Sequence, residues 1–486
     1  MPAKVVLIAE RSELGIVRDR LLSPFPGAAT REVRPLLLGN GECPHLHSRA
    51  MIKLTRYQWT VFFAAWLGWG FDIFDGLLFN FVAPNAIPTL LGLEIGGAEA
   101  RAAVPYWNGI LNSILLLGWA AGGVIFGPLS DRFGRKRVLM ITMLLYALGT
   151  ASCAFVTEMW QLVIFRIVAS LGIGGEWAAG SAMVAEVVPE EKRVEAGALL
   201  YTSAPFGLFL ADFVNTQVAG HWFIHDPSTS WRYVLMFGLL PAAVAFIVRA
   251  FIKEPEKWSA TAATAAPARV REIFAPDMRA RTFSALIVAV TALITWWTCN
   301  AFIQAMSNSL AGAEAVRLGL DAGATTVLKR DWMTLAMYSF CWGGLIGTLL
   351  TVPVAKMMGR RPMYAIYFAG SALALLATFG LDLPAETRLR MYFFIGLTVF
   401  GVFGSFTFYL PELFPTRLRS TGSGFCYNIG RVVTAGGVFA VGMVQNAAKG
   451  DPDVFVRTMF TIGFVPIVGL LLLHWVIETR GQKMPD

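Results

Sequence analysis

Long apolar stretches separated by short polar segments fill the chain from about residue 57 onward. A helix needs about 20 consecutive and mostly apolar residues to cross a bilayer, and the pattern supplies twelve stretches of that kind. We therefore predict an all-α membrane protein with twelve transmembrane helices. The predicted spans are 57–82, 106–127, 138–156, 160–184, 195–219, 232–252, 283–306, 333–355, 363–380, 390–410, 422–445 and 456–477.

A basic segment with an Ala- and Thr-rich middle divides these stretches into two groups of six, and a polar segment rich in Arg and Pro precedes the first group. This punctuation predicts the domain organisation. It consists of a poorly ordered N-terminal extension at 1–52, a six-helix bundle at 53–252, a cytoplasmic linker at 253–281, a second six-helix bundle at 282–478 and a short tail at 479–486.

Short loop motifs recur in the two groups at one offset. The loop Gly127–Lys136 after the second span has a shorter counterpart, Lys356–Arg361, about 225 positions later. The exit of the fourth span, Glu186–Arg193, returns 226 positions later as Glu412–Arg419. Two loops that agree on one offset predict two pseudo-symmetric halves. Transporters with such repeats bind substrate near mid-membrane, where the halves meet.

Composition agrees with this pattern. Hydrophobic residues make up 56 % of the 486 positions, charged residues 15 %, and the mean hydropathy is +0.59, whereas soluble domains carry about a quarter charged residues. The net charge of +8 is spread over short basic clusters between apolar stretches, which is typical of cytoplasmic loops of membrane proteins. We therefore expect an inner (plasma) membrane protein with both termini in the cytoplasm and with no nucleic-acid partner.

Several function classes lack their motifs. No Gly-x-x-x-x-Gly-Lys-Ser/Thr loop is present, so ATP-driven pumping is not expected. The cysteines show no redox or metal spacing, apart from Cys43 close to His45 and His47, where no fourth ligand is near. We predict a monomer that is not an enzyme and that needs no cofactor and no metal.

Four segments resemble a known family. The loop Gly127–Lys136 resembles the signature loop between helices two and three of the major facilitator superfamily, and Arg166–Gly175 is similar to a second motif of that family. Pro411–Arg417 resembles the exit of helix ten in sugar porters and metabolite:proton symporters. Trp69–Gly76 resembles the first helix of carboxylate symporters, including sialate, lactate and aromatic-acid carriers. The resemblance implies the major facilitator fold. Lys356 departs from it, because the second-half loop of the family has an aspartate there.

Charged groups inside spans are costly, at about 2.5–3.5 kcal/mol on insertion scales, and often serve function. Asp72 and Asp75 lie three residues apart and so share one helix face. Two neighbouring carboxylates cannot both ionise cheaply, so one of them is expected to carry a proton. The resemblance to sugar porters implies that one of them pairs with Arg166, and Glu176 is a candidate for the rest of the proton path. The alternative is a permanent structural ion pair.

Arg431 in the eleventh span is the main candidate for binding an anion, because a guanidinium offers paired donors that match a carboxylate. A structural role within the helix bundle is the alternative. Aromatic and amide side chains of the seventh span suggest a cavity lining, unless the aromatics form an interfacial belt. The predicted substrate-binding set is Arg431, Trp297, Asn300, Gln304, Trp69, Asn428 and Tyr409.

The loop signature predicts a gate. Asp131 can accept hydrogen bonds at the N-terminus of a neighbouring helix, and Arg135 can pair with Glu186 or Glu190. The alternative is that these charges only set topology and contact lipid headgroups. The predicted gating set is Gly127, Asp131, Arg132, Gly134, Arg135, Lys136, Glu186, Glu412 and Arg419.

Together these features predict a secondary active transporter that couples proton entry to uptake of a small organic anion, a carboxylate-bearing metabolite, by alternating access. Its partners would be the substrate, protons and membrane lipid. Two alternatives stay open, namely a proton-coupled sugar or polyol symporter on the same fold and a transport-like nutrient sensor. The direction of transport is also open.

Overall fold

The structure is a computed structural model that describes residues 54–223, 225–239, 243–244, 246–247, 252–253, 269–447 and 451–482. Within these ranges all regular secondary structure is helical. The expected extension at 1–52 and most of the linker at 253–281 lie outside the described residues. Before the linker the helices are α1 (Arg56–Leu91), α2 (Ala98–Phe133), α3 (Arg135–Cys153), α4 (Met159–Val187), η1 (Glu190–Lys192), α5 (Arg193–Tyr201), α6 (Ser203–Gln217), the π-helix η2 (Val218–Trp222) and α7 (Pro227–Phe237).

The second group of helices begins inside the predicted linker and continues to the last predicted span. It consists of η3 (Val270–Phe274), α10 (Arg279–Leu318), α11 (Ala322–Met358), α12 (Arg360–Gly380), α13 (Ala385–Arg390), α14 (Tyr392–Leu413), η4 (Thr416–Leu418), α15 (Arg419–Ala447), α16 (Pro452–Ile462), α17 (Val465–Leu472) and η5 (Leu473–Trp475). Every predicted span except 232–252 coincides with described helix along most of its length. For that span α7 covers only the start.

Ten helices in the described part of the chain are long and apolar enough to cross a membrane. The helix α3 is not among them, and the span 232–252 is described only in part. The described part of the chain is therefore all-helical and contains several helices that could span a membrane, whereas the layout of twelve spans in two halves stays a prediction.

Helix ends follow local chemistry. Thr55 begins α1 with a capping box, in which its side chain accepts from the backbone of Gln58. Asp321 begins α11 by accepting a 2.7 Å hydrogen bond from the backbone N–H of Ala324. The sharp turns before α3 and α12 use Gly134 and Gly359, whose φ angles of 106° and 99° favour glycine.

Small residues bring helices into close contact at two equivalent places. A Cβ atom on Gly118 or Gly122 of α2 would overlap α4, and one on Gly343 or Gly347 of α11 would overlap α14. Glycines three or four apart allow this close backbone approach in membrane helices. The two pairs of glycines are 225 positions apart, so the offset that was read from the loops also relates packing contacts deep in the bundle.

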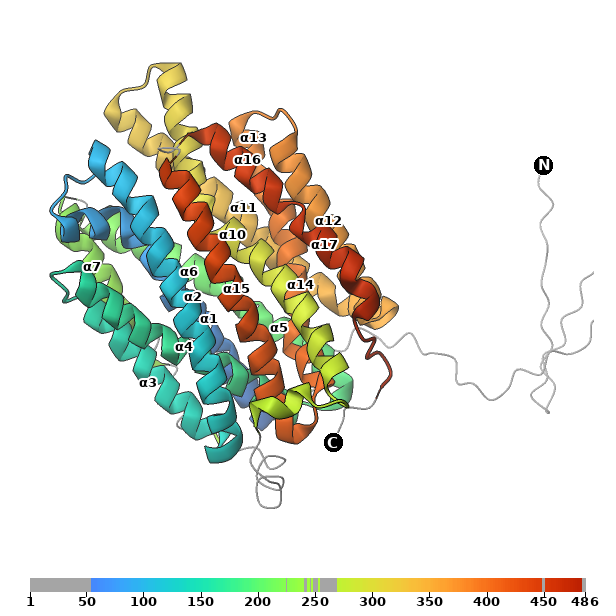
Figure 1. Ribbon diagram of the computed structural model, residues 1–486. Helices are drawn as coiled ribbons and strands as arrows, with labels where there is room; N and C mark the ends of the chain where they lie inside the picture. The colour runs from blue at the N-terminus through green and yellow to red at the C-terminus, as the bar shows by residue number, and fades with distance from the viewer. Residues whose placement is uncertain are drawn as a thin grey trace, which may run out of the picture. The chain divides into compact units, whose positions relative to one another are not determined.

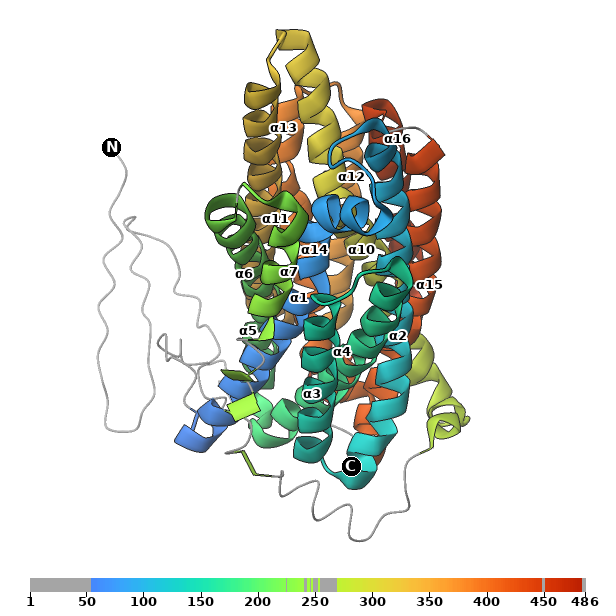
Figure 2. The same cartoon turned by 90° about the vertical axis from the view of Figure 1, so that its left-hand side faces the viewer.

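Helices from before and after the linker pack directly against each other. The helices α2 and α15 run side by side (Figures 1 and 2). The Oγ of Ser113 donates a 3.1 Å hydrogen bond to the carbonyl of Ala435. A second contact joins α5 and α6 to α11, and α5 also packs on α14. These two contact regions enclose the candidate site.

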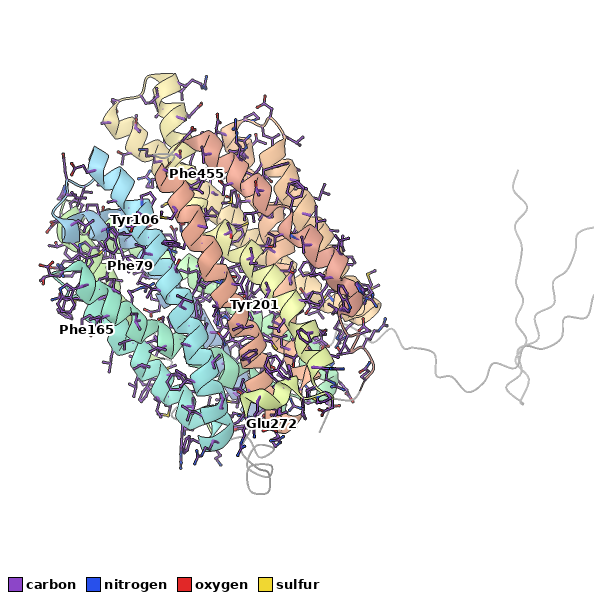
Figure 3. The ribbon with its side chains drawn as sticks, in the orientation of Figure 1. Phe79, Tyr106, Phe165, Tyr201, Glu272 and Phe455 are labelled. Atoms are coloured by element: carbon purple, nitrogen blue, oxygen red, sulfur yellow. The ribbon has the colours of Figure 1, made fainter. Side chains whose placement is uncertain are left out.

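The two ends of the bundle differ in charge. We call the end that carries Arg135 and Arg360 the basic end, and the opposite end the far end. Figure 3 shows Glu272 at the basic end and Tyr106 and Phe455 towards the far end. Since α1, α5, α10 and α15 start at the basic end, the depth of a side chain follows from its distance along the helix, at 1.5 Å per residue.

Candidate functional site

One arginine lies in an aromatic enclosure near the middle of the bundle, twelve residues from the start of α15. The guanidinium carbon of Arg431 is 4.0 Å from the ring centroid of Trp119 and 4.3 Å from that of Tyr427. Its Nη1 donates a hydrogen bond to Oδ1 of Asn428. Its Nε has no hydrogen-bond partner among the described residues. The rings cover the guanidinium and leave the Nε–H group able to bind an anion.

Aromatic rings from four helices continue the enclosure. Trp69 of α1 packs edge-on against Trp177 of α4 and Tyr201 of α5, with centroids 5.7 and 5.0 Å apart. Trp177 in turn stacks on Tyr427 of α15 at 4.2 Å and 22°. Rings from helices before and after the linker therefore meet face to face.

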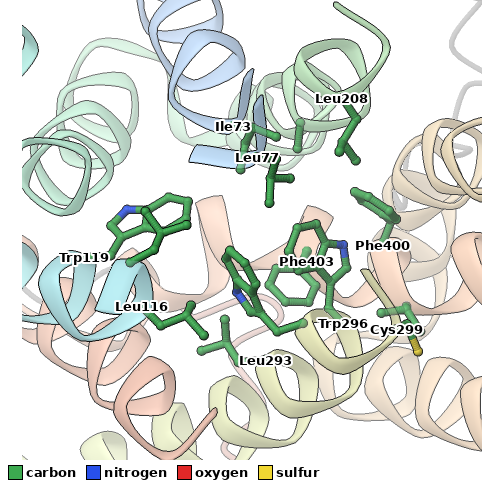
Figure 4. Close-up of a cluster of buried hydrophobic side chains, with 14 of the residues drawn as sticks. Ile73, Leu77, Leu116, Trp119, Leu208, Leu293, Trp296, Cys299, Phe400 and Phe403 are labelled. Atoms are coloured by element: carbon green, nitrogen blue, oxygen red, sulfur yellow. The ribbon is translucent and has the colours of Figure 1, made fainter. Parts of the chain in front are cut away.

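The helices α10 and α14 supply the remaining wall, shown in Figure 4. Trp297 packs edge-on against Trp119 at 5.7 Å, and its neighbour Trp296 packs against Phe400 at 5.6 Å and Phe403 at 5.8 Å. Both tryptophans are 2 % exposed. They therefore lie in the core of the bundle and not in a belt on its surface.

The enclosure contains polar atoms that no described residue satisfies. These are the indole N–H groups of Trp119, Trp177 and Trp296 and both amide atoms of Asn300. Each of these residues is at most 3 % exposed. Buried polar groups are normally hydrogen-bonded, so these atoms suit a ligand that brings its own acceptors. Gln304 is half-buried and lies one turn further along α10.

The two aspartates of α1 face different neighbours. The Oδ2 of Asp75 accepts a 2.7 Å hydrogen bond from Thr150 of α3, and the charge of Asp75 acts on Arg166 of α4. The charge of Asp72 acts on Arg431 instead. Both aspartates are 3 % exposed. The structure thus places Asp75 within electrostatic range of Arg166, without the ion pair that was expected for one of the two aspartates, and places Asp72 within electrostatic range of Arg431.

Arg166 is 1 % exposed and is held by few contacts. Its Nη2 donates a 3.1 Å hydrogen bond to the carbonyl of Gly76, and its guanidinium lies 5.2 Å from the ring centroid of Phe79. In the described ranges its Nε and Nη1 have no partner, and no ion pair within 4.0 Å joins it to Asp75. Asp75 and Arg166 therefore interact at a distance. Protonation of Asp75 would not have to break a direct bond between the two side chains.

Two other predicted residues take separate places. Glu176 is buried in α4 directly before Trp177. Tyr409 lies away from the enclosure, because its hydroxyl is within 2.7 Å of the Ser284 hydroxyl and donates a 2.9 Å hydrogen bond to the carbonyl of Ile477. The structure therefore does not bring Tyr409 together with Arg431.

Four residues form a first polar cluster at the basic end. Arg135 donates to Asp131 and, at 3.0 Å, to Glu186. The second carboxylate oxygen of Asp131 accepts from the backbone N–H of Thr421 at 3.1 Å and from its hydroxyl at 2.6 Å. Thr421 lies in the first turn of α15, where the helix dipole favours an anion. The cluster therefore joins the end of α2 to the start of α15.

A second polar cluster repeats these contacts. Arg360 pairs with Glu412 at 2.8 Å, and Lys356 of α11 pairs with Glu195 of α5. Each of the four lies 225 or 226 positions from its counterpart in the first cluster. Because lysine replaces aspartate, the contact across the two groups of helices is kept while its chemistry changes to an ion pair.

The remaining gating candidates surround the first cluster. Gly127 lies against α15, where an added Cβ would meet a backbone oxygen at 3.7 Å, and Gly134 makes the turn into α3. Arg419 is buried and Lys136 is half-buried. Arg132 is exposed and lies 5.1 Å from the ring of Phe133, which follows it.

The linker is also attached at the basic end. The Arg417 guanidinium donates a hydrogen bond to the carboxylate of Glu272 in η3. This bond holds the pKa of Glu272 below its usual range. It ties the described part of the linker to η4, directly before α15.

The predictions from sequence omitted several residues that these contacts use, among them Trp119, Tyr201, Thr150, Glu195 and Thr421. An aromatic or hydroxyl residue within an apolar stretch carries no signal of its own. Glu195 and Thr421, which belong to the polar clusters, could have been found from the repeat, because its offset relates position 195 to position 421. Trp119 had a weaker one, because three glycines surround it and glycines in a span indicate close helix packing.

Comparison with known proteins now identifies the class. The sequence pattern of the Major Facilitator Superfamily matches residues 59–438, and the chain belongs to this family. It is 29 % identical over 436 residues to the "Probable 4-methylmuconolactone transporter" of Cupriavidus pinatubonensis, covering 87 % of this chain and 91 % of the relative. It is 28 % identical to the cis,cis-muconate transport protein of Acinetobacter baylyi, over 70 % of this chain and 79 % of the relative.

A solved structure supports the fold. The proton:xylose symporter XylE, bound to 6-bromo-6-deoxy-D-glucose, matches with a TM-score of 0.68 and 17 % identity, over 88 % of this chain and 98 % of the symporter. The protein is therefore a multi-pass membrane transporter for a small molecule and is not an enzyme.

Proposed function

We propose that the protein is a secondary transporter that imports a small, flat organic anion together with protons. The observation that carries this proposal is the buried Arg431, covered by Trp119 and Tyr427, whose Nε has no hydrogen-bond partner among the described residues. The names of two relatives, for 4-methylmuconolactone and for cis,cis-muconate, agree with a substrate of this kind.

The enclosure suits a conjugated acid better than a sugar. A carboxylate can accept a charge-assisted hydrogen bond from Nε of Arg431, while the flat body of the substrate lies against rings such as Trp69 and Trp177. A sugar brings many hydroxyl donors, which need acceptors. The unpartnered polar atoms of the enclosure are mostly N–H donors, so they favour a ligand rich in acceptors.

We assign the binding of the transported proton to Asp75. When Asp75 is ionised, its charge stabilises the buried Arg166, and a buried charge without a partner is costly. Protonation removes that stabilisation and favours a different arrangement of α1 and α4. The bond from Thr150 fits either state, because a hydroxyl can donate to a carboxylate or accept from a carboxylic acid. Substrate binding at Arg431 would change the electrostatic environment of Asp72, because the two side chains interact.

The remaining parts of the proposal concern the whole protein. We assign twelve spans to two halves at 53–252 and 282–478, which rock around the enclosure and expose it alternately to the two sides. The basic end would face the cytoplasm together with both termini, as its charge suggests. The protein would lie in the inner membrane and would transport its substrate as a monomer.

The test uses protein reconstituted in liposomes, with cis,cis-muconate as the probe. Asp75→Asn should abolish accumulation driven by an inward proton gradient and leave counterflow exchange measurable, because a neutral side chain cannot carry the proton but still permits the bound carrier to turn over. Asp331→Asn, at an exposed position, should behave as the parent. Gradient-driven accumulation by Asp75→Asn at the parent level would exclude the assignment. Uptake of xylose but of no carboxylic acid would favour the sugar symporter instead.

A further inference from the structure

One buried carboxyl group takes part in none of the contacts described above. Asp212 of α6 is 4 % exposed and stands 19 residues beyond the start of α5, or about 28 Å from the basic end along the nearly continuous helix. Phe209 lies three residues before it and therefore on the same helix face. This face meets α11, which belongs to the other group of helices.

The opposing face of α11 carries Tyr338, Cys341 and Trp342. The ring of Phe209 packs edge-on against Tyr338 at 5.4 Å and against Trp342 at 5.7 Å. The charge of Asp212 acts on Tyr338 and on Cys341, and Cys341 is fully buried. We call this contact of α6 with α11 the far seam. It is one of the places where the two groups of helices must separate if the far end is to open.

No cation compensates Asp212 in the part of the chain that the structure describes. The carboxyl group of Asp212 takes part in no hydrogen bond or ion pair with the described residues. The elements packed against α6 are α1, α5, α7, α11 and η2. Charged groups at the ends of α1, α5 and α11 lie at the basic end. The other described charged or titratable groups on the elements around α6 are Asp72, Asp75, Tyr201, His221, Arg232, Tyr233, Lys329, Arg330, Asp331, Tyr338 and Cys341. Arg232 is committed to the carbonyls of Ala154 and Val156, and Arg330 pairs with Asp331.

From this arrangement we infer that Asp212 is a second proton-binding site, whose protonation accompanies closure of the far seam. An ionised carboxylate is stable in water but is heavily penalised when buried without a partner. With the seam open, Asp212 would be hydrated and ionised. A proton from water on the far side then binds one carboxylate oxygen, and the neutral acid is buried as the seam closes. When the seam reopens the proton returns to the same side.

The role of Asp212 therefore differs from that of Asp75. Asp75 would carry a proton across the membrane, whereas Asp212 would make closure depend on the pH of the far side without adding to the proton count. This inference rests on the proposed alternating access of the two halves, but it does not depend on Asp75 or on the identity of the substrate.

Cys341 provides a built-in reporter for the test. In protein whose other four cysteines are replaced by alanine, a membrane-impermeant methanethiosulfonate reagent is added from the far side at external pH 5 to 8. The rate of labelling of Cys341 is then compared between the parent and Asp212→Asn at each pH, so that the titration of the thiol itself cancels in the ratio. The parent should label at least tenfold faster than Asp212→Asn at high pH, and the two rates should converge at low pH.

Controls separate this inference from the proposed function. Asp75→Asn should lose proton-driven accumulation yet keep the pH response of Cys341 labelling. Asp212→Glu should keep the response because it retains a titratable carboxyl group, and it also serves if Asp212→Asn folds poorly. A ratio of parent to Asp212→Asn that is the same at every pH would overturn the inference, and so would an Asp212→Glu variant without a response.

Discussion

The presence of an arginine and not a lysine at position 431 indicates what kind of ligand the site binds. Its guanidinium carbon lies 4.0 Å from the Trp119 ring and 4.3 Å from the Tyr427 ring. Only a flat cation can stack in this way and still offer paired donors at its edge, whereas a lysine ammonium is a compact and strongly hydrated charge. The side chain is therefore expected to be required as an arginine and not simply as a positive charge.

The corresponding prediction concerns Arg431→Lys and Arg431→Ala. Hydrogen bonds to charged groups contribute about 1.5–3 kcal/mol, so Arg431→Lys should weaken binding of cis,cis-muconate by roughly ten- to a hundredfold. Arg431→Ala should weaken it further. Titration calorimetry on purified protein measures both, with the exposed Arg330→Lys as control. Unchanged affinity in Arg431→Lys would show that paired donors do not hold the anion.

Glycines of α4 allow a second test at the same scale, on the packing that positions Trp119. A Cβ atom on Gly174 would overlap the carbonyl oxygen of Trp119, whereas one on Gly180 of the same helix has open space around it. Gly174→Ala should lower stability by about 1–3 kcal/mol through overpacking. Gly180→Ala should be neutral or stabilising by up to about 1 kcal/mol, since alanine favours helix. Thermal unfolding in detergent compares the two, and equal effects would refute the packing argument.

Sequence reasoning located some of these residues and not their partners. The depth of Asp75 and of Arg166 follows from counting residues along spans of opposite direction, so their proximity was foreseeable. The separation of Asp72 from Asp75 was not. Two residues three apart differ by about 60° around a helix, and that angle decides between different neighbours only once the positions of α4 and α15 are known.

Single elements show where hydropathy succeeds and where it fails. The apolar centre of each described span was found, but most ends were placed too far inward. For example, α11 begins at Ala322, capped by Asp321, although the apolar stretch starts near residue 333. A helix continues for as long as its backbone bonds and caps are satisfied, whereas hydropathy reports only the part that lies in lipid.

The ends of α5 and α11 explain the reversed charge of the second polar cluster. Glu195 lies in the first turn of α5 and Lys356 in the last turn of α11, so each charge is favourable to the dipole of its own helix. Asp131 at the end of α2 has no such advantage and depends on Arg135 and Thr421. The two clusters thus reach the same contact by different physical means.

This difference predicts the effect of charge reversal. The pair of Lys356 and Glu195 is partly exposed, at 43 % and 16 % for the side chains, so it should contribute about 0.2–1 kcal/mol to closure of the basic end. Lys356→Glu or Glu195→Lys alone should open that end more often, and the double reversal should restore closure. Spin-label distances across the basic end measure this, and high salt should weaken the parent contact. Failure of the double variant to recover would argue against the pair.

At the scale of the whole molecule, an offset of 225 or 226 positions relates several contacts in the described part of the chain. The relation holds for glycine contacts between α2 and α4 and between α11 and α14, and for both polar clusters. The offset was visible in two loops of the sequence. The structure adds that contacts across the two groups of helices obey it too, which could not be foreseen because no local pattern reports which distant segments meet.

Contacts at both ends of α2 and α15 lead to a test of alternating access. At the far end the backbones of Gly109 and Gly442 approach closely, since a Cβ on either would lie 3.4–3.5 Å from the Cα of the other. At the basic end Gly127 lies against Thr421. In a cysteine-free background, the pairs Gly109→Cys with Gly442→Cys and Gly127→Cys with Thr421→Cys should each form a disulfide on oxidation, because such close pairs meet the geometry that a disulfide requires.

Each disulfide should stop turnover, and reduction should restore it, because a carrier must open at both ends in alternation while a channel or sensor need not. The two locks should differ in accessibility. With Cys341 restored to that background, a reagent added from the far side should still reach it when only the basic end is locked, and should not reach it when the far end is locked. Parent-level uptake of cis,cis-muconate with either disulfide fully formed would rule out rocking of the two halves about the enclosure, since the locked end would then not have to separate for the substrate to pass.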